Sequence, residues 1–205
     1  ITESGKIIIG ESEFINCTSL LSITIKSDNK SQVIFGNNCF SGAVNLIDFN
    51  LEKCEVTINN NCFESCKSLK KLSIIEMSKI SIAENQLVGL DSLQNVVLKS
   101  KSEINIGQNC FSESPKLETV EFIGSEISIA SNCFTQKVDK NDHKPFKISM
   151  TAPNVELFDN SFHNSNIKEV EINGQTVSLF NECFSACSLL DSFKRFIFSR
   201  FGNNT

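Results

Sequence analysis

Residues 56–74 read VTINNNCFESCKSLKKLSI, and this phrase returns in altered form along the chain. It joins the pattern I/V-x-I/L-x-x-x-x-F to a following L-x-x-L-x-I. Eight copies carry a Phe or Leu as their anchor residue, at Phe14, Phe40, Phe63, Leu87, Phe111, Phe134, Phe162 and Phe184. The steps between anchors are 26, 23, 24, 24, 23, 28 and 22 residues. A repeat of this period predicts a solenoid, because one turn is too small to bury its own apolar face and has to stack on its neighbours.

Two sets of apolar positions flank each anchor. The first set lies seven and five residues before it, as Ile7/Ile9, Val33/Phe35, Val56/Ile58, Ile80/Ile82, Ile104/Ile106, Ile127/Ile129, Val155/Leu157 and Val177/Leu179. The second set follows the anchor, as Leu20/Ile23/Ile25, Leu46/Phe49/Leu51, Leu69/Leu72/Ile74, Leu93/Val96/Leu98, Leu117/Val120/Phe122 and Ile167/Val170/Ile172. Alternation of apolar and polar residues indicates strands with one buried face. We therefore predict a mostly β solenoid of about eight turns, with two short strands and a short helical or 3₁₀ turn per repeat.

We expect a single domain over residues 1–205, with repeats at about 7–193. Three segments depart from the repeat pattern. Extra residues at 138–145 predict a surface loop, after which the strand resumes at Phe146, and residues 27–31 predict a smaller bulge. The last turn places Arg195 where an apolar residue belongs. The aromatic and basic stretch at 194–205 is expected to be a cap or a truncated tail, with end-to-end contact as one possible role.

The nine cysteines follow the repeat. Five of them directly precede an anchor, three lie three residues after one, and Cys54 alone is outside these two columns. Ala43, Ser114, Ser161 and Ser165 occupy the same columns. A residue type that keeps the phase of the repeat fills one small buried slot in each turn. This placement argues against a metal site, which needs four ligands, and against a complete set of disulfides. Reduced thiols favour a cytoplasmic compartment.

Asparagine occupies the second position before the anchor in six of the eight copies, from Asn38 to Asn160. An Asn side chain bonds to the backbone of its own tight turn and tolerates left-handed backbone geometry. A structural role is therefore expected for this column.

The turn at residues 61–74, NCFESCKSLKKLSI, resembles the BspA-like class of leucine-rich repeats, and the resemblance extends over about residues 7–193. It implies a right-handed leucine-rich-repeat coil in which the L-x-x-L-x-L strand faces inward. Family members in bacteria and protists are often surface proteins linked to adhesion, which implies recognition of host or matrix proteins. The family has no catalytic motif to carry over.

The net charge, the distribution of apolar residues and the absence of known motifs argue against several classes of function. The net charge of −5 and the pI of about 5.2 argue against a nucleic-acid surface. The longest purely apolar run covers only residues 7–9, so we expect no membrane insertion. No P-loop, zinc-protease or nucleophile-elbow motif is present. We expect no enzyme, no cofactor and no metal, and we expect Glu169 and Glu171 to lie on a solvated strand face.

The outward residues of the L-x-x-L-x-L strands are the candidate binding face, because solenoids use such extended surfaces for partners. Its predicted centre consists of Lys71, Ser73, Ile75, Asn95, Val97, Lys99, Thr119, Glu121 and Ile123. Within it, Ile75, Val97 and Ile123 form a modest apolar patch, or they are β-branched residues that simply suit strands.

Two functions fit these features. One is a non-catalytic protein-interaction scaffold, intracellular or part of a large assembly such as the cytoskeleton, which the thiols and the absence of Tyr and Trp favour. The alternative is a cell-surface adhesion or recognition module, which the family resemblance implies. The partner in either case is a protein of unknown identity.

Overall fold

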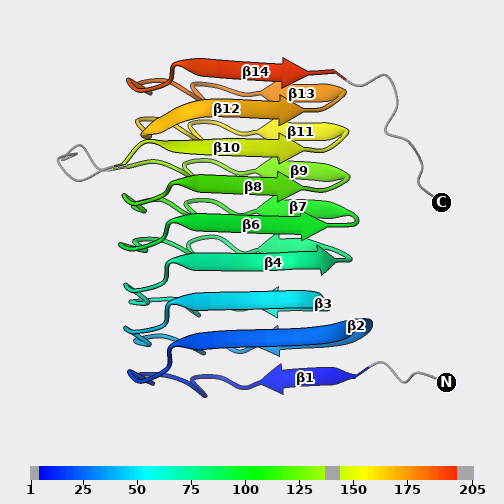
Figure 1. Ribbon diagram of the computed structural model, residues 1–205, viewed down its shortest axis with the longest axis vertical. Helices are drawn as coiled ribbons and strands as arrows, with labels where there is room; N and C mark the ends of the chain where they lie inside the picture. Colours follow the sequence, from blue (N-terminus) through cyan, green and yellow to red (C-terminus); the bar gives the residue numbers. More distant parts are fainter. Residues whose placement is uncertain (1–4, 137–143, 198–205) are drawn as a thin grey trace.

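The protein is a stack of eight coils, each of which adds one strand to each of two parallel sheets (Figure 1). The computed structural model describes residues 5–136 and 144–197. We number the coils 1 to 8 by their anchors, from Phe14 to Phe184. Within a coil the chain runs along the back sheet, through a connector that carries the anchor, and then along the front sheet.

All neighbouring strands in both sheets are parallel and follow the order of the coils. The front sheet contains β2 (Ser22–Phe35), β3 (Asp48–Ile58), β4 (Lys71–Met77), β6 (Asn95–Ser100), β8 (Thr119–Ile123), β10 (Phe146–Thr151), β12 (Ile167–Asn173) and β14 (Ser192–Phe196). The back sheet contains β1 (Lys6–Ile9), the second halves of β2 and β3, β5 (Ile80–Ile82), β7 (Glu103–Ile106), β9 (Glu126–Ile129), β11 (Asn154–Leu157) and β13 (Thr176–Leu179).

The predicted solenoid is therefore confirmed, with one difference in its strands. β2 and β3 each run from the front sheet into the back sheet, so a single strand serves both, with a left-handed residue, Lys53 at a φ of 59°, inside β3. The predicted bulge at residues 27–31 lies inside β2, where the pairing with β3 shifts between Lys26 and Ser31. The strand after the predicted loop resumes at Phe146 as expected, while most of that loop lies outside the described residues.

The apolar positions found in the repeat form the core between the two sheets. Phe63 and Phe111 are 1% and 0% exposed, as a stacked solenoid requires. The anchor rings lie one above another: Phe111 and Phe134 are 5.4 Å apart, and Phe134 and Phe162 are 4.7 Å apart with planes within 1°. Leu87 takes the place of a ring in coil 4 and is equally buried. Offset or stacked rings add to the burial free energy, so the aromatic column stabilises the alignment of successive coils.

The connectors differ from the prediction: the described residues contain no α- or 3₁₀-helix at the anchor, only isolated turns. Coil 2 shows the actual arrangement. The amides of Ser41, Ala43 and Leu46 donate to carbonyls three residues back, at 3.0, 2.9 and 3.0 Å. Those of Asn38, Phe40 and Gly42 instead donate to coil 3, at 2.9, 3.1 and 2.9 Å.

Left-handed backbone geometry explains this alternation. Asn38 and Gly42 have φ of 56° and 74°, which turns their amides out of their own coil and along the stack. A helix would point every amide back along its own segment and leave adjacent coils without bonds between them. In coils 1, 2 and 7 the connector thus adds a third set of hydrogen bonds beside the two sheets, while in coil 3 no described residue accepts the amides of Asn61, Phe63 and Ser65.

Candidate functional site

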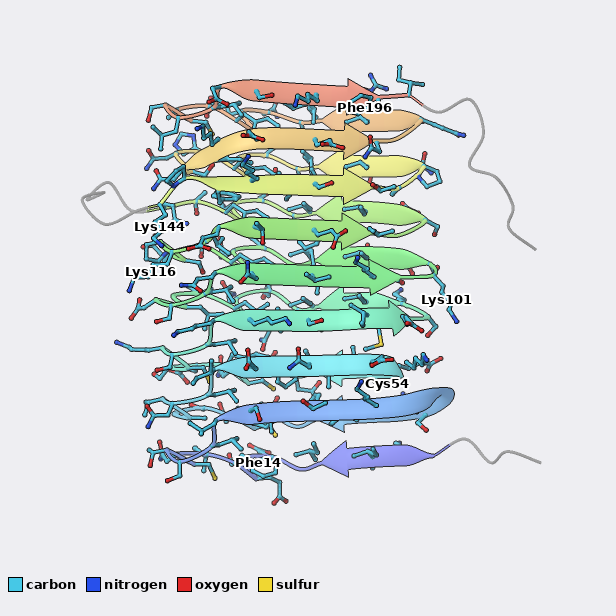
Figure 2. All side chains as sticks on the ribbon, in the orientation of Figure 1. Phe14, Cys54, Lys101, Lys116, Lys144 and Phe196 are labelled. Atoms are coloured by element: carbon cyan, nitrogen blue, oxygen red, sulfur yellow. The ribbon has the colours of Figure 1, made fainter. Side chains whose placement is uncertain are left out.

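The outward face of the front sheet consists of three columns of side chains that run the length of the stack. Strand register places these residues side by side from coil to coil. The first column is Ser22, Asp48, Lys71, Asn95, Thr119, Lys147, Glu169 and Ser192. The second is Thr24, Asn50, Ser73, Val97, Glu121, Ser149, Glu171 and Lys194. The third is Lys26, Glu52, Ile75, Lys99, Ile123, Thr151, Asn173 and Phe196. This sheet faces the reader in Figure 2, where Phe196 marks the last coil.

The nine residues predicted from the sequence lie together on coils 3 to 5 of this face. Lys71, Asn95 and Thr119 are paired across β4, β6 and β8, and the Asn95 amide donates to the Thr119 hydroxyl at 2.8 Å. Ser73 pairs with Val97, which in turn pairs with Glu121. All nine side chains are exposed or half-buried. Register alone brings them together, because each strand repeats the alternation of its neighbour.

The apolar patch suggested by Ile75, Val97 and Ile123 is divided. Lys99 pairs with Ile123 in the third column. It follows Leu98, which pairs with Ile74, the residue before Ile75, so Lys99 comes between the two isoleucines in the order of the strands. Its ammonium is 2.9 Å from a Glu121 carboxylate oxygen. A partner that covers the centre of the face therefore meets an ion pair between apolar side chains.

Ion pairs between successive coils determine much of the charge pattern on this face. Lys26 is 2.9 Å from Glu52, and Lys147 is 2.6 Å from Glu169. The hydrogen bond from Lys26 lowers the pKa of Glu52 below its usual range, and the one from Lys147 does the same for the pKa of Glu169. The face also carries Lys71 and Lys194, for which the described residues provide no carboxylate within 4.0 Å. Their charges are available to a partner.

Two shallow depressions flank the predicted centre. The first lies over coils 1 to 3 and is lined by residues that include Thr24, Asn50, Lys71, Ser73 and Ile75. The second lies over coils 5 to 8 and is lined by residues that include Thr119, Glu121, Lys147, Ser149, Glu169, Glu171, Ser192 and Lys194. Five of the nine predicted residues thus line a depression. The prediction missed the second depression beyond coil 5. The sequence feature that could have indicated this depression is Ser149, a small residue that lies between the longer side chains of Glu121 and Glu171 in the second column.

The cysteines have the structural role that their phase predicted. Seven of the nine are buried, and all nine are free thiols. The Cys62 thiol donates to the Gly36 carbonyl of the preceding coil at 3.1 Å, and the Cys110 thiol donates to the Ala83 carbonyl at 3.0 Å. Burial raises the pKa of both thiols to about 11. A protonated, buried thiol is a poor nucleophile and a poor metal ligand. In the part of the chain that the structure describes, no group of three or more His, Cys, Asp or Glu side chains could hold a metal.

One polar pair lies outside the front face. The Nδ1 atom of His163 is 2.5 Å from the Ser185 hydroxyl, which also donates to the Glu182 carbonyl at 3.1 Å. His163 therefore contacts a serine of the next coil rather than a cysteine. Glu169 and Glu171 project from the front sheet, where Lys147 and Asn173 bind them. They lie on a strand face, as predicted.

No helix long and apolar enough to span a bilayer occurs in the described ranges, 5–136 and 144–197.

Comparison with known proteins links the chain to one repeat family. A family model described as "BspA type Leucine rich repeat region (6 copies)" matches residues 7–141 and 141–196. Among solved structures, a leucine-rich repeat protein from Bacteroides ovatus ATCC 8483 is similar at 14% identity, with a TM-score of 0.34. That similarity covers 90% of this chain and 69% of the other. No curated protein matches the chain.

Proposed function

The chain belongs to the BspA-type leucine-rich repeat family, and from this premise we propose that it is a non-catalytic scaffold that binds a protein partner through its front sheet. The observation that carries the proposal is the continuous outward face of that sheet. Eight coils in register present three columns of mostly polar side chains, while their apolar side chains point into the core. A long, regular surface of this kind suits a broad contact with another protein.

The chemistry of the face indicates what sort of contact it makes. The chain has no Tyr and no Trp, the residues that dominate small, tight hot spots. Its columns carry charges of both signs, several of them in ion pairs between coils, so it repels neither acidic nor basic partners as a whole. Specificity then depends on how well the partner's surface complements the charged and apolar side chains of this face. Carboxylates of the partner would lie opposite Lys71 and Lys194, and its apolar side chains would cover Ile75 and Val97.

The test is capture of partners by the immobilised protein from two separate pools, a soluble cell extract with cytoskeletal polymers and a preparation of cell-surface and matrix proteins. The variants Ile75→Asp and Val97→Asp place a charge at the centre of the face, and we expect each to abolish the specific capture. Ser81→Asp, at an exposed position on the back sheet of coil 4, is the matched control and should bind normally. Capture that survives both front-face variants would refute the proposal.

We further propose an intracellular role, in a large assembly such as the cytoskeleton. The support is the set of nine free thiols, seven of them buried where a disulfide partner cannot reach them. The alternative, a cell-surface adhesion module, is favoured by the exposed Asn16 in the sequence Asn16-Cys17-Thr18, a possible glycosylation site. Mass spectrometry of the protein from its own cell separates the two: a glycan at Asn16 would exclude the intracellular role.

A further inference from the structure

The junction between coils 3 and 4 lacks hydrogen bonds on the side of the connectors, which form the left side of the stack in Figure 1. In coils 1, 2 and 7, three alternate amides of the connector donate to three alternate carbonyls of the next coil. The equivalent amides of coil 3, those of Asn61, Phe63 and Ser65, have no acceptor among the described residues. A row of unpaired N–H groups is a template with which another chain can pair.

Coil 4 has a longer side chain, Gln86, directly before its anchor, where five of the eight coils have Cys. The thiols of Cys62 and Cys110 donate from this position to carbonyls of the preceding coil. Gln86 instead donates to the Glu84 carbonyl of its own coil at 3.3 Å. It is 4% exposed, and its Oε1 atom has no hydrogen-bond partner among the described residues. A buried acceptor without a partner costs free energy, which an N–H group of a ligand would offset.

A depression of about 350 Å³ lies at this junction, which is within the usual size of ligand sites. Its lining consists of Asn61, Glu64, Ser65, Asn85, Gln86 and Val88. The adjoining back strands are weakly paired, because β3 and β5 pair only at Ile58 and Ile82 among the described residues, whereas β7 and β9 pair over four residues. Leu87 also interrupts the column of anchor rings. Few contacts therefore hold the coil 4 connector against coil 3, and it can move aside at low cost.

We propose that an extended segment of a partner polypeptide binds along the coil 3 connector, where carbonyls of its alternate residues accept the amides of Asn61, Phe63 and Ser65. The other coils indicate why the ligand is a main chain. In coils 1, 2 and 7 the equivalent amides donate to alternate backbone carbonyls of a segment that runs in the same direction. In this mode of recognition, main-chain hydrogen bonds provide the affinity.

The side chains of the depression indicate the chemistry of the partner segment. Gln86 Oε1 accepts an N–H group of the segment, which removes its lack of a partner. Among the residues that line the depression, Glu64 alone is charged. The site therefore favours a segment that carries Lys, Asn or Gln side chains over an acidic one. It lies on the connector side of the stack and shares no residue with the front face.

A phage-displayed library of random linear peptides is the probe for this site. Peptides selected on the full wild-type chain are added to it, and NMR follows its amide chemical shifts and hydrogen exchange. We expect the amides of Asn61, Phe63 and Ser65 to shift and to exchange more slowly with peptide bound. Gln86→Cys restores the residue type of the other coils and should close the junction. The three amides should then be protected without peptide, and the peptide should bind roughly tenfold more weakly.

Ser161→Cys is the matched control, because it introduces the same residue at the same position of coil 7, whose connector bonds are complete. It should bind the peptide like wild type. Glu64→Lys reverses the charge of the lining and should weaken the binding of basic peptides even if Gln86→Cys leaves the junction open.

Three results would overturn the proposal: slow exchange of the three amides in wild type without peptide, a selection that yields no peptide shifting them, and an affinity unchanged by both Gln86→Cys and Glu64→Lys. A glycan array is the parallel probe, and a sugar that shifts these amides when no selected peptide does would also refute it. The front-face variants Ile75→Asp and Val97→Asp should leave peptide binding unchanged, so this test is independent of the one for partner capture.

Discussion

At the scale of single residues, one backbone conformation recurs in every coil. The residue two positions before the anchor has a φ between 53° and 60° in all eight coils, at Ser12, Asn38, Asn61, Asn85, Asn109, Asn132, Asn160 and Glu182. Non-glycine residues rarely adopt this left-handed geometry, and Asn does so at the lowest cost. The six asparagines of this column are therefore explained by the backbone, and the predicted left-handed geometry is confirmed. The predicted bond from the Asn side chain to the backbone of its own turn is not present among the described residues, where the Asn109 amide donates instead to the Asn85 side chain of the preceding coil at 2.7 Å.

Asn61 allows a direct measurement of this effect, because its side chain is exposed and the conformation is its main constraint. Asn61→Ala should lower the free energy of unfolding by about 1 kcal/mol, since a Cβ without a polar group is strained at this φ. Asn61→Gly should change it by only a few tenths of a kcal/mol, because Gly adopts the geometry freely. Chemical denaturation of the three proteins makes the comparison. Equal losses for Ala and Gly would show that the Asn side chain, rather than the backbone, is responsible.

At the scale of the coil, the backbones of neighbouring coils approach one another closely at two glycines, Gly36 and Gly107. Four residues before the anchor, where the back strand meets the connector, a Cβ at Gly107 would lie 2.5 Å from the Glu84 nitrogen and 2.7 Å from the Ala83 carbonyl carbon. A Cβ at Gly36 would meet the backbone of coil 1 at the same short distance. Real Cβ contacts are essentially never this short, so a side chain at either glycine would force the adjacent backbone to shift. The same position holds Ala83, Ala130 and Phe158 in coils 4, 6 and 7, so the close approach belongs to these two glycines.

Gly107→Ala should therefore destabilise the protein by about 1–3 kcal/mol, the usual cost of an overpacked site whose neighbours are backbone atoms. Ala130→Gly, at the equivalent position of coil 6, is the control and should cost less than about 1 kcal/mol, because it removes a methyl group without creating a clash. Thermal unfolding measures both. If Gly107→Ala were as stable as wild type, coils 4 and 5 would have to lie farther apart than they do here.

At the scale of the whole molecule, stability is spread along the stack, since each coil contacts mainly its two neighbours. Residues 88–111 span one full repeat, from just after the Leu87 anchor to the Phe111 anchor. Their deletion brings β4 beside β8 and β5 beside β9, strands that share one register through β6 and β7. Solenoids accept such changes because their interfaces repeat.

The chain without residues 88–111 should thus fold and unfold cooperatively, with a smaller denaturant m-value that reflects its smaller buried surface. Deletion of residues 88–99 alone removes half a repeat and should abolish folding, because it connects the coil 4 connector directly to a back strand. Circular dichroism and denaturant titration distinguish the two. A folded half-repeat deletion would contradict the register described here.

Much of the fold could be predicted because the repeat is a translation along one axis. Phe63 and Phe111 are in the core, Cys62 and Cys110 fill equivalent slots, and Lys71, Asn95 and Thr119 lie side by side, all as their shared phase indicated. Each of these features depends only on which positions of one coil face inward. The period of the sequence contains that information, because side chains alternate along a strand.

The tertiary structure alone decided how one coil binds the next. Neither the alternating amides of the connector, nor the Lys99–Glu121 pair that divides the apolar patch, nor the depression around Ser149 follows from the period. These contacts join residues more than twenty positions apart, and their geometry depends on backbone angles at Asn38 and Gly42 and on the reach of long side chains. The sequence by itself determined which residues face the core. Contacts between coils decided how the side chains of the surface pair with one another, because hydrogen bonds and ion pairs are directional and hydrophobic burial is not.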